Sequence, residues 1–272
     1  MRIEAAGYSD RGVVRRENDD YFLLGRRFAQ SECLTLDLAL QDDEFRQYGL
    51  IAAVADGMGG YAGGEIASRT VLETLRDMYY CETRANVTAR ELTAMLERYL
   101  ADTQQRLAET LTANPALHDA GTTLAGIALL PPDALVVFHI GDSRVLRAAS
   151  GYVRALTVDH SLVGADLASG RLTEAQAAAT GVTNQLTRAL GLTGDNTVEV
   201  STDHTWAPGD TFLLGTDGWH GVGRGVTRDT IRELVRTGLS PEPLVRAMLG
   251  RALAVDGKDN VTSVVVRVVD DE

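Results

Sequence analysis

The residues best suited to chemistry are aspartates at the ends of apolar, strand-like runs. The clearest is Asp56, which follows the run 52–55 and opens a turn with five glycines between Gly57 and Gly64. Glycines let the backbone adopt positive φ and let another group approach closely. Four more apolar runs end or begin at an aspartate: Asp20, Asp142, Asp217 and Asp259. The pattern predicts charged oxygen ligands at the rim of a buried core.

These aspartates can lie close together even though they are far apart in the chain. Asp56, Asp142 and Asp217 follow their strands, whereas Asp20 and Asp259 precede theirs. Neighbouring antiparallel strands place the end of one beside the start of the next, so all five can share one edge. A simpler alternative stays open at this point, because Asp-Gly is also an ordinary solvated turn.

A cluster of carboxylates with a backbone carbonyl, and without His or Cys, favours Mg²⁺ or Mn²⁺. So many acids suit two ions, which at roughly 3.5–4 Å separation share a water and lower its pKa for attack on phosphorus. Such a reaction also needs a cation to hold the phosphate oxygens. Arg15 is the candidate, because a planar guanidinium matches phosphate geometry. The residues therefore predict hydrolysis of a phosphate ester.

Composition narrows the compartment and the partners. The 272 residues have 44% hydrophobic content and a formal charge of -12, which favours a globular protein and argues against nucleic acid or an anionic membrane as partner. Cys33 and Cys81 cannot form a disulfide framework. No run reaches the roughly 20 apolar residues of a membrane span, and no signal peptide is recognisable. We therefore expect a cytoplasmic protein.

The elements that must position the acids follow from hydrophobic periodicity. Helices are predicted at 66–79, at 88–111 behind a Thr88/Glu91 capping box, at 228–236, and at 241–254 with Ser240 as cap. Strand patterns cover these ranges: 2–9, 21–24, 52–55, 120–158 as a meander, 197–200, 211–214 and 261–269. Residues 25–49 show only an irregular connection.

Strand groups that alternate with helix pairs predict an α+β fold. We expect a four-layer α/β/β/α sandwich, in which two packed antiparallel sheets are flanked by helix pairs, as a single domain over residues 1–272. The segment at about 160–195 is glycine-rich, with one short helix predicted near 173–179. Segments this long with little regular structure are often functional.

Eight motifs succeed one another along the chain, within residues 10–20, 54–60, 120–123, 141–144, 157–161, 186–191, 216–218 and 259–262. Their residues and order resemble the metal-dependent serine/threonine protein phosphatases of type 2C, the PPM family, in bacterial form. The resemblance implies a protein-serine/threonine phosphatase. It would hydrolyse phosphoserine and phosphothreonine by attack of a metal-bridging water, opposing a bacterial serine/threonine kinase.

The resemblance also implies which residues hold two Mn²⁺ or Mg²⁺ ions. Asp56 would bridge both ions, and the Gly57 carbonyl and Asp20 would bind the second. Asp217 and Asp259 would complete the ligands of the first.

Further roles are implied around this pair of ions. Asp142 would hold a weaker third ion, and Arg15 would bind the substrate phosphate, so that Arg15, Asp56 and Asp217 are the expected catalytic residues. Asp19 and Asn260 would lie just outside the ligands, and residues 160–190 would form a mobile flap.

Three positions depart from the common pattern of the family, and the least of these changes is Thr216 in place of a frequent serine. Asp19 stands where a glutamate is more usual. Met58 stands where animal members carry a histidine proposed as the general acid, so the leaving group would be protonated by another group. His139 lies in an apolar run, and we expect it to be a packed core residue.

Two alternatives remain within the family. A catalytically inactive member would bind phosphoproteins without hydrolysing them. The intact ligands count against it: Asp20, Asp56, Asp217 and Asp259. A phosphatase of a phosphorylated transcription regulator usually carries sensor or membrane regions, for which this chain has no room. We expect a monomer whose partners are phosphorylated proteins and a cognate kinase pathway.

Overall fold

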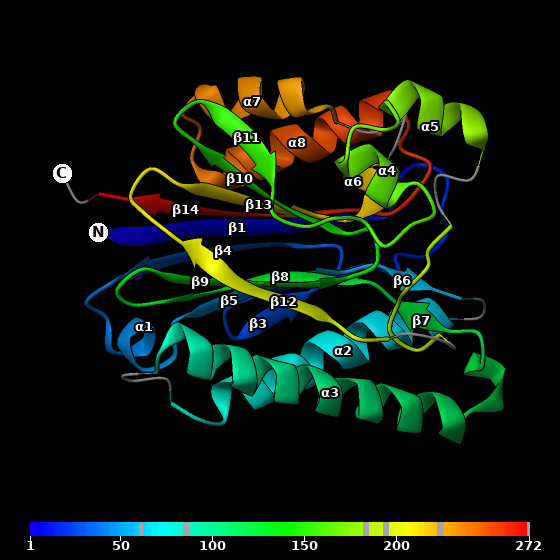
Figure 1. Ribbon diagram of the computed structural model, residues 1–272, viewed down its shortest axis with the longest axis horizontal. Helices are drawn as coiled ribbons and strands as arrows, with labels where there is room; N and C mark the ends of the chain where they lie inside the picture. Colours follow the sequence, from blue (N-terminus) through cyan, green and yellow to red (C-terminus); the bar gives the residue numbers. More distant parts are fainter. Residues whose placement is uncertain (60–61, 84–86, 182–184, 193–195, 222–225, 271–272) are drawn as a thin grey trace.

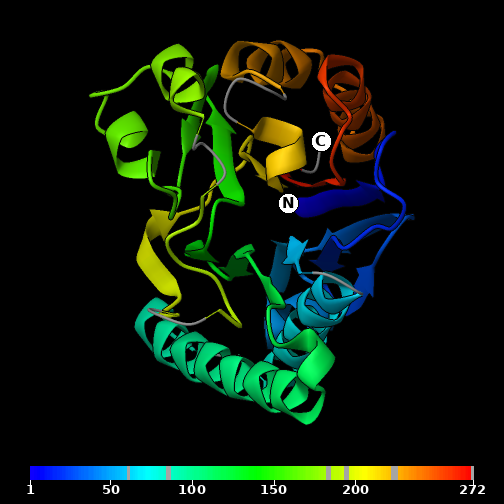
Figure 2. The same cartoon turned by 90° about the vertical axis from the view of Figure 1, so that its right-hand side faces the viewer.

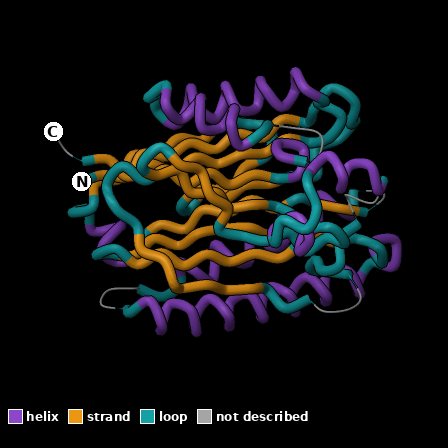
Figure 3. Tube along the Cα trace, turned by 45° about the horizontal axis from the view of Figure 1, so that its top comes forward, coloured by secondary structure: helices purple, strands orange, loops and turns teal. Residues whose placement is uncertain are grey.

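Two six-stranded antiparallel sheets stack face to face (Figures 1 and 3). The computed structural model describes residues 1–270 apart from 60–61, 84–86, 182–184, 193–195 and 222–225. In spatial order, sheet A contains β11 (Tyr152–Ala155), β10 (Arg144–Ala149), β13 (Thr211–Gly215), β14 (Val261–Val269), β1 (Arg2–Asp10) and β4 (Cys33–Ala39). Sheet B contains β12 (Glu199–Thr205), β9 (Ala134–Ile140), β8 (Leu124–Leu130), β5 (Leu50–Ala55), β2 (Tyr21–Leu24) and β3 (Arg27–Ala29). The short strands β6 (Gly57–Met58) and β7 (Gly121–Thr122) pair with each other.

A pair of helices covers the outer face of each sheet (Figure 1). The helices α2 (Gly63–Tyr80) and α3 (Ala89–Ala113) pack on sheet B, and α7 (Arg228–Arg236) and α8 (Pro241–Val255) pack on sheet A. This is the predicted α/β/β/α order of layers. Shorter helices are α1 (Asp43–Tyr48), α4 (Gly164–Ala168), α5 (Glu174–Thr180), α6 (Asp217–His220) and the 3₁₀ turn Pro115–Leu117. No described helix has the length and apolar character needed to cross a bilayer.

Three apolar layers hold the sandwich together. Phe22, Phe212 and Val264 fill the space between the two sheets. Val71 and Leu107 belong to the layer between sheet B and its helices. A third layer, between sheet A and its helices, contains Trp219, Leu244 and Met248. Because each such fully buried side chain contributes roughly 1.5–3 kcal/mol, these layers fix the sheet ends rigidly in space.

The predicted helix starts are largely confirmed. Thr88 Oγ1 accepts from the Glu91 amide at 3.3 Å, and Glu91 Oε2 accepts from the Thr88 amide at 2.8 Å, which completes the capping box of α3. Thr227 caps α7 through the Thr230 amide at 3.2 Å. Ser240 precedes α8 as predicted, but its side chain makes no capping hydrogen bond.

Two predictions about the chain path are wrong. Residues 25–49 are not an irregular connection, because they form β3, β4 and α1. In β4, leucines alternate with polar residues, as expected for a strand with one buried face. Residues 120–158 are not one meander. β8 and β9 pair in sheet B, and the chain then crosses at Gly141, φ +99°, to form β10 and β11 in sheet A.

The strand register brings the aspartates to one end of the sandwich. In sheet B, Tyr21 pairs with Ala55, so Asp20 and Asp56 are adjacent. In sheet A, Arg144 pairs with Gly215, so the segments carrying Asp142 and Asp217 meet there. Asp259 lies just before β14, the neighbour of β13. This end carries α6 and β6 in Figure 1 and faces the viewer in Figure 2.

Candidate metal centre

Asp20 is buried with only part of its carboxylate satisfied. It is 1% exposed, and its Oδ2 accepts a hydrogen bond from Thr216 Oγ1 at 2.8 Å. Its Oδ1 has no hydrogen-bond partner in the described part of the chain. Burial raises the pKa of Asp20 to about 7, with Asp217 and Asp259 adding to the rise, while hydrogen bonds from Thr262 and Thr216 lower it. A buried carboxylate oxygen without a protein partner is suited to binding a cation.

Asp56 lies electrostatically at the centre of the group. Its amide donates to Thr123 Oγ1 at 3.1 Å, and its carbonyl accepts from the Thr123 amide and Thr122 Oγ1, each at 2.9 Å. The backbone is therefore held from both sides. Burial raises the pKa of its carboxyl well above the ordinary value, and four neighbouring carboxylates raise it further: Asp20, Asp217, Asp142 and Asp259. The other four predicted acids thus all act on Asp56.

Gly57 is needed because of its packing. A Cβ at this position would lie 2.2 Å from the Gly64 carbonyl oxygen and 2.6 Å from the Asp19 carbonyl oxygen. A side chain would therefore push the start of α2 away from β6. The glycine-rich turn predicted from the sequence brings α2 against the strand that carries Asp56. Gly60, within that turn, lies outside the described residues.

Asp142 lies between the other acids and the ion pair of Arg144 with Asp159. Burial raises the pKa of its carboxyl to about 8, Asp217 and Asp159 raise it further, and Arg144 lowers it. Arg144 itself is paired with Asp159, with Nε–Oδ1 at 2.8 Å and Nη2–Oδ2 at 2.6 Å. In the described residues, neither Asp142 nor Asp56 forms an ion pair with Arg or Lys.

Arg15 reaches this end of the molecule from the loop after β1. Its Nε lies 2.8 Å from Asp259 Oδ1 and its Nη2 lies 3.0 Å from Asp259 Oδ2. The hydrogen bond to Asp259 raises the pKa of Arg15, and the charges of Asp259, Asp56 and Asp19 add to the rise while burial opposes it. The Arg15 side chain remains 55% exposed. An exposed guanidinium beside the acids can exchange its carboxylate partner for another anion.

Asn260 holds the loop that carries Arg15 and Asp19. Its Nδ2 donates to the carbonyls of Arg11 and Glu17, each at 2.9 Å, and its Oδ1 accepts from the Asp19 amide at 2.9 Å. The Asp19 carboxylate keeps one buried oxygen without a partner in the described residues. Burial raises the pKa of Asp19, as do Glu17 and Glu65, while Arg15 lowers it. The side chain of Asn260 thus fixes the backbone of the 11–19 loop by hydrogen bonds.

Sequence reasoning assigned no role to a set of hydroxyl groups that join the two sheets. Thr216 Oγ1 accepts from the Thr262 amide at 3.1 Å while it donates to Asp20. Thr262 Oγ1 lies 2.7 Å from Ser9 Oγ, which accepts from Asn18 Nδ2 at 2.8 Å. This chain links sheet A to Asp20 of sheet B. The only local signal was the pairing of Thr with Asp at 216–217.

A histidine cluster lies beside the segment that carries Asp142, where the Gly141 amide donates to His160 Nδ1 at 3.1 Å. His139 is 5% exposed, as expected for a core residue, and its Nε2 lies 3.0 Å from the Val158 carbonyl. His139 stacks on His160, whose Nε2 lies 3.1 Å from Glu199 Oε1. Arg188 also bonds Glu199, at 2.7 Å, and so fills the space between these potential ligands.

The acidic group itself has the properties of a divalent-metal site. Its donors are carboxylates, which suit Mg²⁺ and Mn²⁺ rather than softer metals. The raised pKa values of Asp20, Asp56 and Asp142 reflect burial and mutual repulsion, which an external cation would relieve. The residues present therefore fit the ions expected from the sequence.

Comparisons with known proteins agree with this chemistry. The family model described as protein phosphatase 2C matches residues 33–254. The chain is 31% identical over 217 residues to the serine/threonine phosphatase stp of Listeria innocua, covering 79% of this chain and 83% of the relative. It is 31% identical over 268 residues to the serine/threonine protein phosphatase PstP of Mycobacterium tuberculosis, covering 98% of this chain but 45% of PstP.

Solved structures show the same fold. The crystal structure of M. tuberculosis PstP matches with a TM-score of 0.76 at 28% identity, covering 99% of this chain and 100% of that one. The PstP catalytic domain in complex with two manganese ions gives the same TM-score and coverage. The phosphatase MsPP of Mycobacterium smegmatis, in complex with cacodylate, matches with a TM-score of 0.72 at 29% identity, covering 97% of each chain. The chain therefore belongs to the protein phosphatase 2C family of metal-dependent serine/threonine protein phosphatases.

Proposed function

We propose that this phosphatase hydrolyses phosphoserine and phosphothreonine in proteins with two Mn²⁺ or Mg²⁺ ions held at the acidic end of the sandwich. The observation that carries the proposal is the group of carboxylates whose burial and mutual repulsion raise the pKa of Asp56. The relatives named serine/threonine phosphatases, and the two manganese ions in the PstP complex, support the same assignment.

The proposed ligand roles are those that the family resemblance implies. Asp56, whose pKa is raised by burial and by the charges of the other four carboxylates, would bridge the two ions. Asp20 and the Gly57 carbonyl would bind one ion, and Asp217 and Asp259 the other. Asp142, at the margin of the group, would hold a third. When bound, the ions supply a water of lowered pKa as the nucleophile.

Arg15 is proposed to bind the substrate phosphate. Its forked guanidinium already holds the two oxygens of Asp259 in a bidentate arrangement, the same geometry that it would present to two phosphate oxygens. Substrate phosphate would compete with Asp259 for this group. Asn260 would keep Arg15 in place through the loop that it ties down, and Asp19 would hold water beside the metal ligands.

The remaining proposals concern the surroundings of the site. We propose a single domain in which residues of about 160–195 act as a flap beside the acids; of these, 182–184 and 193–195 lie outside the described residues. The base of this segment is held by the pairings of Ser161 with Leu186 and of Thr122 with Leu190. The physiological partners would be phosphoproteins produced by a bacterial serine/threonine kinase in the cytoplasm.

Phosphate release from a phosphothreonine peptide, measured with Mn²⁺ and with EDTA, tests this function. Activity should require the metal. Asp217→Ala should abolish turnover while circular dichroism shows an intact fold, and Arg15→Ala should mainly raise KM, because it removes a phosphate contact. Wild-type activity in Asp217→Ala would show that the ligand assignment is wrong.

A further inference from the structure

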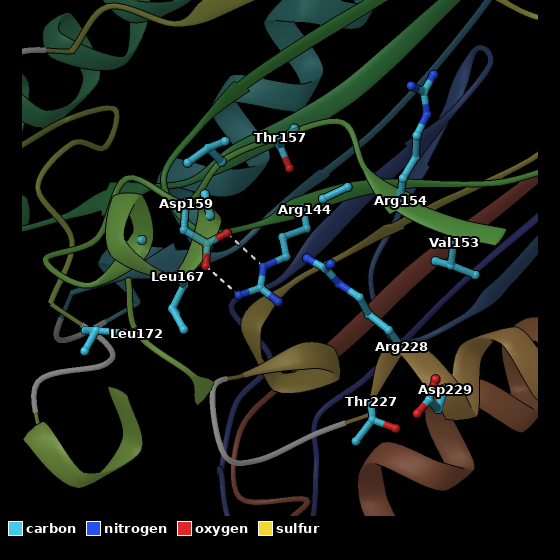
Figure 4. A pocket seen from close by; sticks show the side chains of 14 residues that line it. Arg144, Val153, Arg154, Thr157, Asp159, Leu167, Leu172, Thr227, Arg228 and Asp229 are labelled. Atoms are coloured by element: carbon cyan, nitrogen blue, oxygen red, sulfur yellow. Dashed lines mark hydrogen bonds and ion pairs between the residues drawn. The ribbon is translucent and has the colours of Figure 1, made fainter. Parts of the chain in front are cut away.

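A pocket of about 650 Å³ opens beside the acidic group and is not used by the mechanism above (Figure 4). One wall comes from β10 and β11, a second from residues 157–172, and a third from the first turn of α7. The pocket borders the site, because Arg144 in its wall follows Asp142 by two residues and is fixed there by its ion pair with Asp159 at 2.6 Å. A substrate chain that places its phosphoresidue at the acids therefore passes near this pocket.

The pocket carries an unbalanced positive charge. Of its lining residues, Arg144 is neutralised by Asp159 at 2.6 Å, and Asp229 is neutralised by Arg232 at 2.8 Å. The side chain of Arg228, by contrast, forms no hydrogen bond or ion pair with any part of the chain that the structure describes. Its side chain extends from α7 toward Arg144 in Figure 4. In a protein of formal charge -12, this guanidinium offers an anion a local site of positive charge.

Arg154 provides an internal contrast. It also lines the rim and has no ion-pair partner in the described residues, but its side chain points away from Arg144 and Arg228 (Figure 4). The two arginines therefore have the same charge and are both exposed, but only one is directed at the pocket. Leu167 and Leu172 add apolar surface to the wall, which suits the methylene groups of a glutamate.

We propose that this pocket binds an acidic side chain of the protein substrate, held by Arg228 a few residues from the phosphoresidue. The inference rests on the proposed function and adds a sequence preference to it. Charge complementarity favours a carboxylate over a neutral side chain. Because Arg228 is exposed, the gain is that of a surface ion pair, about two- to five-fold in affinity.

Binding and turnover should be measured separately. A set of phosphothreonine peptides, each with one Glu moved along the positions flanking the phosphoresidue, is compared with matched Gln peptides by kcat/KM. The same peptides with a non-hydrolysable phosphonate are compared by fluorescence polarisation in Mn²⁺. In the wild type, Glu at one or two positions should lower KM and Kd by about two- to five-fold.

Arg228→Glu should remove or reverse this preference, whereas Arg154→Glu, the matched control, should retain it. Hydrolysis of p-nitrophenyl phosphate should be equal in all three proteins, because this small substrate does not reach the pocket. An acidic residue in the first turn of a helix is favourable, so Arg228→Glu should fold normally, which thermal melting will check.

Three outcomes would overturn the proposal: no Glu preference in the wild type, the same preference in Arg228→Glu, or an equal loss in Arg154→Glu, which would indicate only a general surface field. Failure of the proposed function has a different signature. The phosphonate peptides would still bind with the Glu preference, but no peptide would be hydrolysed.

Discussion

Strand β13 has an aspartate at each end, and the two ends of the strand have opposite electrostatics. Asp210, just before the strand, is 3% exposed and forms two hydrogen bonds with Arg147, one of them Nε–Oδ1 at 3.0 Å, plus one from the Ala207 amide at 2.8 Å. Asp217, just after the strand, lies among Asp20, Asp56 and Asp142, whose carboxyl pKa values it raises.

The difference shows that the partners of a buried carboxylate distinguish a structural role from a metal-binding role. A carboxylate with its own arginine and amide donors is satisfied by the fold, and its loss affects stability. A group of carboxylates whose main neighbours are other carboxylates is unfavourable in the fold alone, because burial and like charge both oppose ionisation. Such a group is explained by a cation that the chain does not supply.

The largest effect is expected from the centre of the acidic group. Asp56→Asn should lower Mn²⁺-dependent phosphate release by more than about 100-fold, since even residues that only support metal ligands typically contribute 10- to 100-fold. Asp210→Asn is the matched control, because it makes the same substitution at a buried aspartate and should keep the activity of the folded protein. Equal losses in the two variants would remove the distinction between the two ends.

The free energy of unfolding should show the opposite order, with the larger loss in Asp210→Asn and none in Asp56→Asn. Asp210→Asn leaves the charge of Arg147, whose side chain is 15% exposed, without its carboxylate and should lower the free energy of unfolding by about 3 kcal/mol. Urea denaturation in EDTA measures this value. Asp56→Asn should be at least as stable as the wild type at pH 8, because it removes a carboxyl group that ionises unfavourably in the folded state.

Mn²⁺ should stabilise the folded protein only when the acidic end is intact. A concentration of Mn²⁺ 100 times its Kd should raise the free energy of unfolding by about 2.7 kcal/mol, since the folded protein binds the ion. Thermal melting with and without EDTA should show this shift in the wild type and in Asp210→Asn. In Asp56→Asn the shift should be much smaller; a full shift there would place the metal elsewhere.

The smallest effect concerns a buried base. His220 donates from Nε2 to the Gly215 carbonyl at 2.9 Å, and burial lowers its pKa to about 3. Below pH 6.5 the His220 side chain takes up a proton in the unfolded chain but not in the folded one. Its contribution to the free energy of unfolding therefore decreases as the pH falls below 6.5. The advantage of the wild type over His220→Asn should shrink by up to about 1.4 kcal/mol per pH unit. A constant advantage between pH 7.5 and 5 would contradict this view.

The sequence predicted those parts of the molecule that depend on local pattern. The capping box of α3 and the apolar run of β14 are local, and so is the placement of Asp56 at a strand end. The crossing at Gly141 was missed, because a glycine turn looks the same whether the next strand joins the same sheet or the other one. The path from Thr216 to Asp20 spans 196 positions, so no local pattern could predict it.

Crystals soaked in Mn²⁺ and measured at the manganese absorption edge test the central claim most directly. We predict two anomalous peaks in contact with the Asp56 carboxylate, one beside Asp20 and the Gly57 carbonyl and the other beside Asp217 and Asp259. A soaked crystal of the active protein without a peak at Asp56, or with manganese bound only elsewhere, would contradict the account.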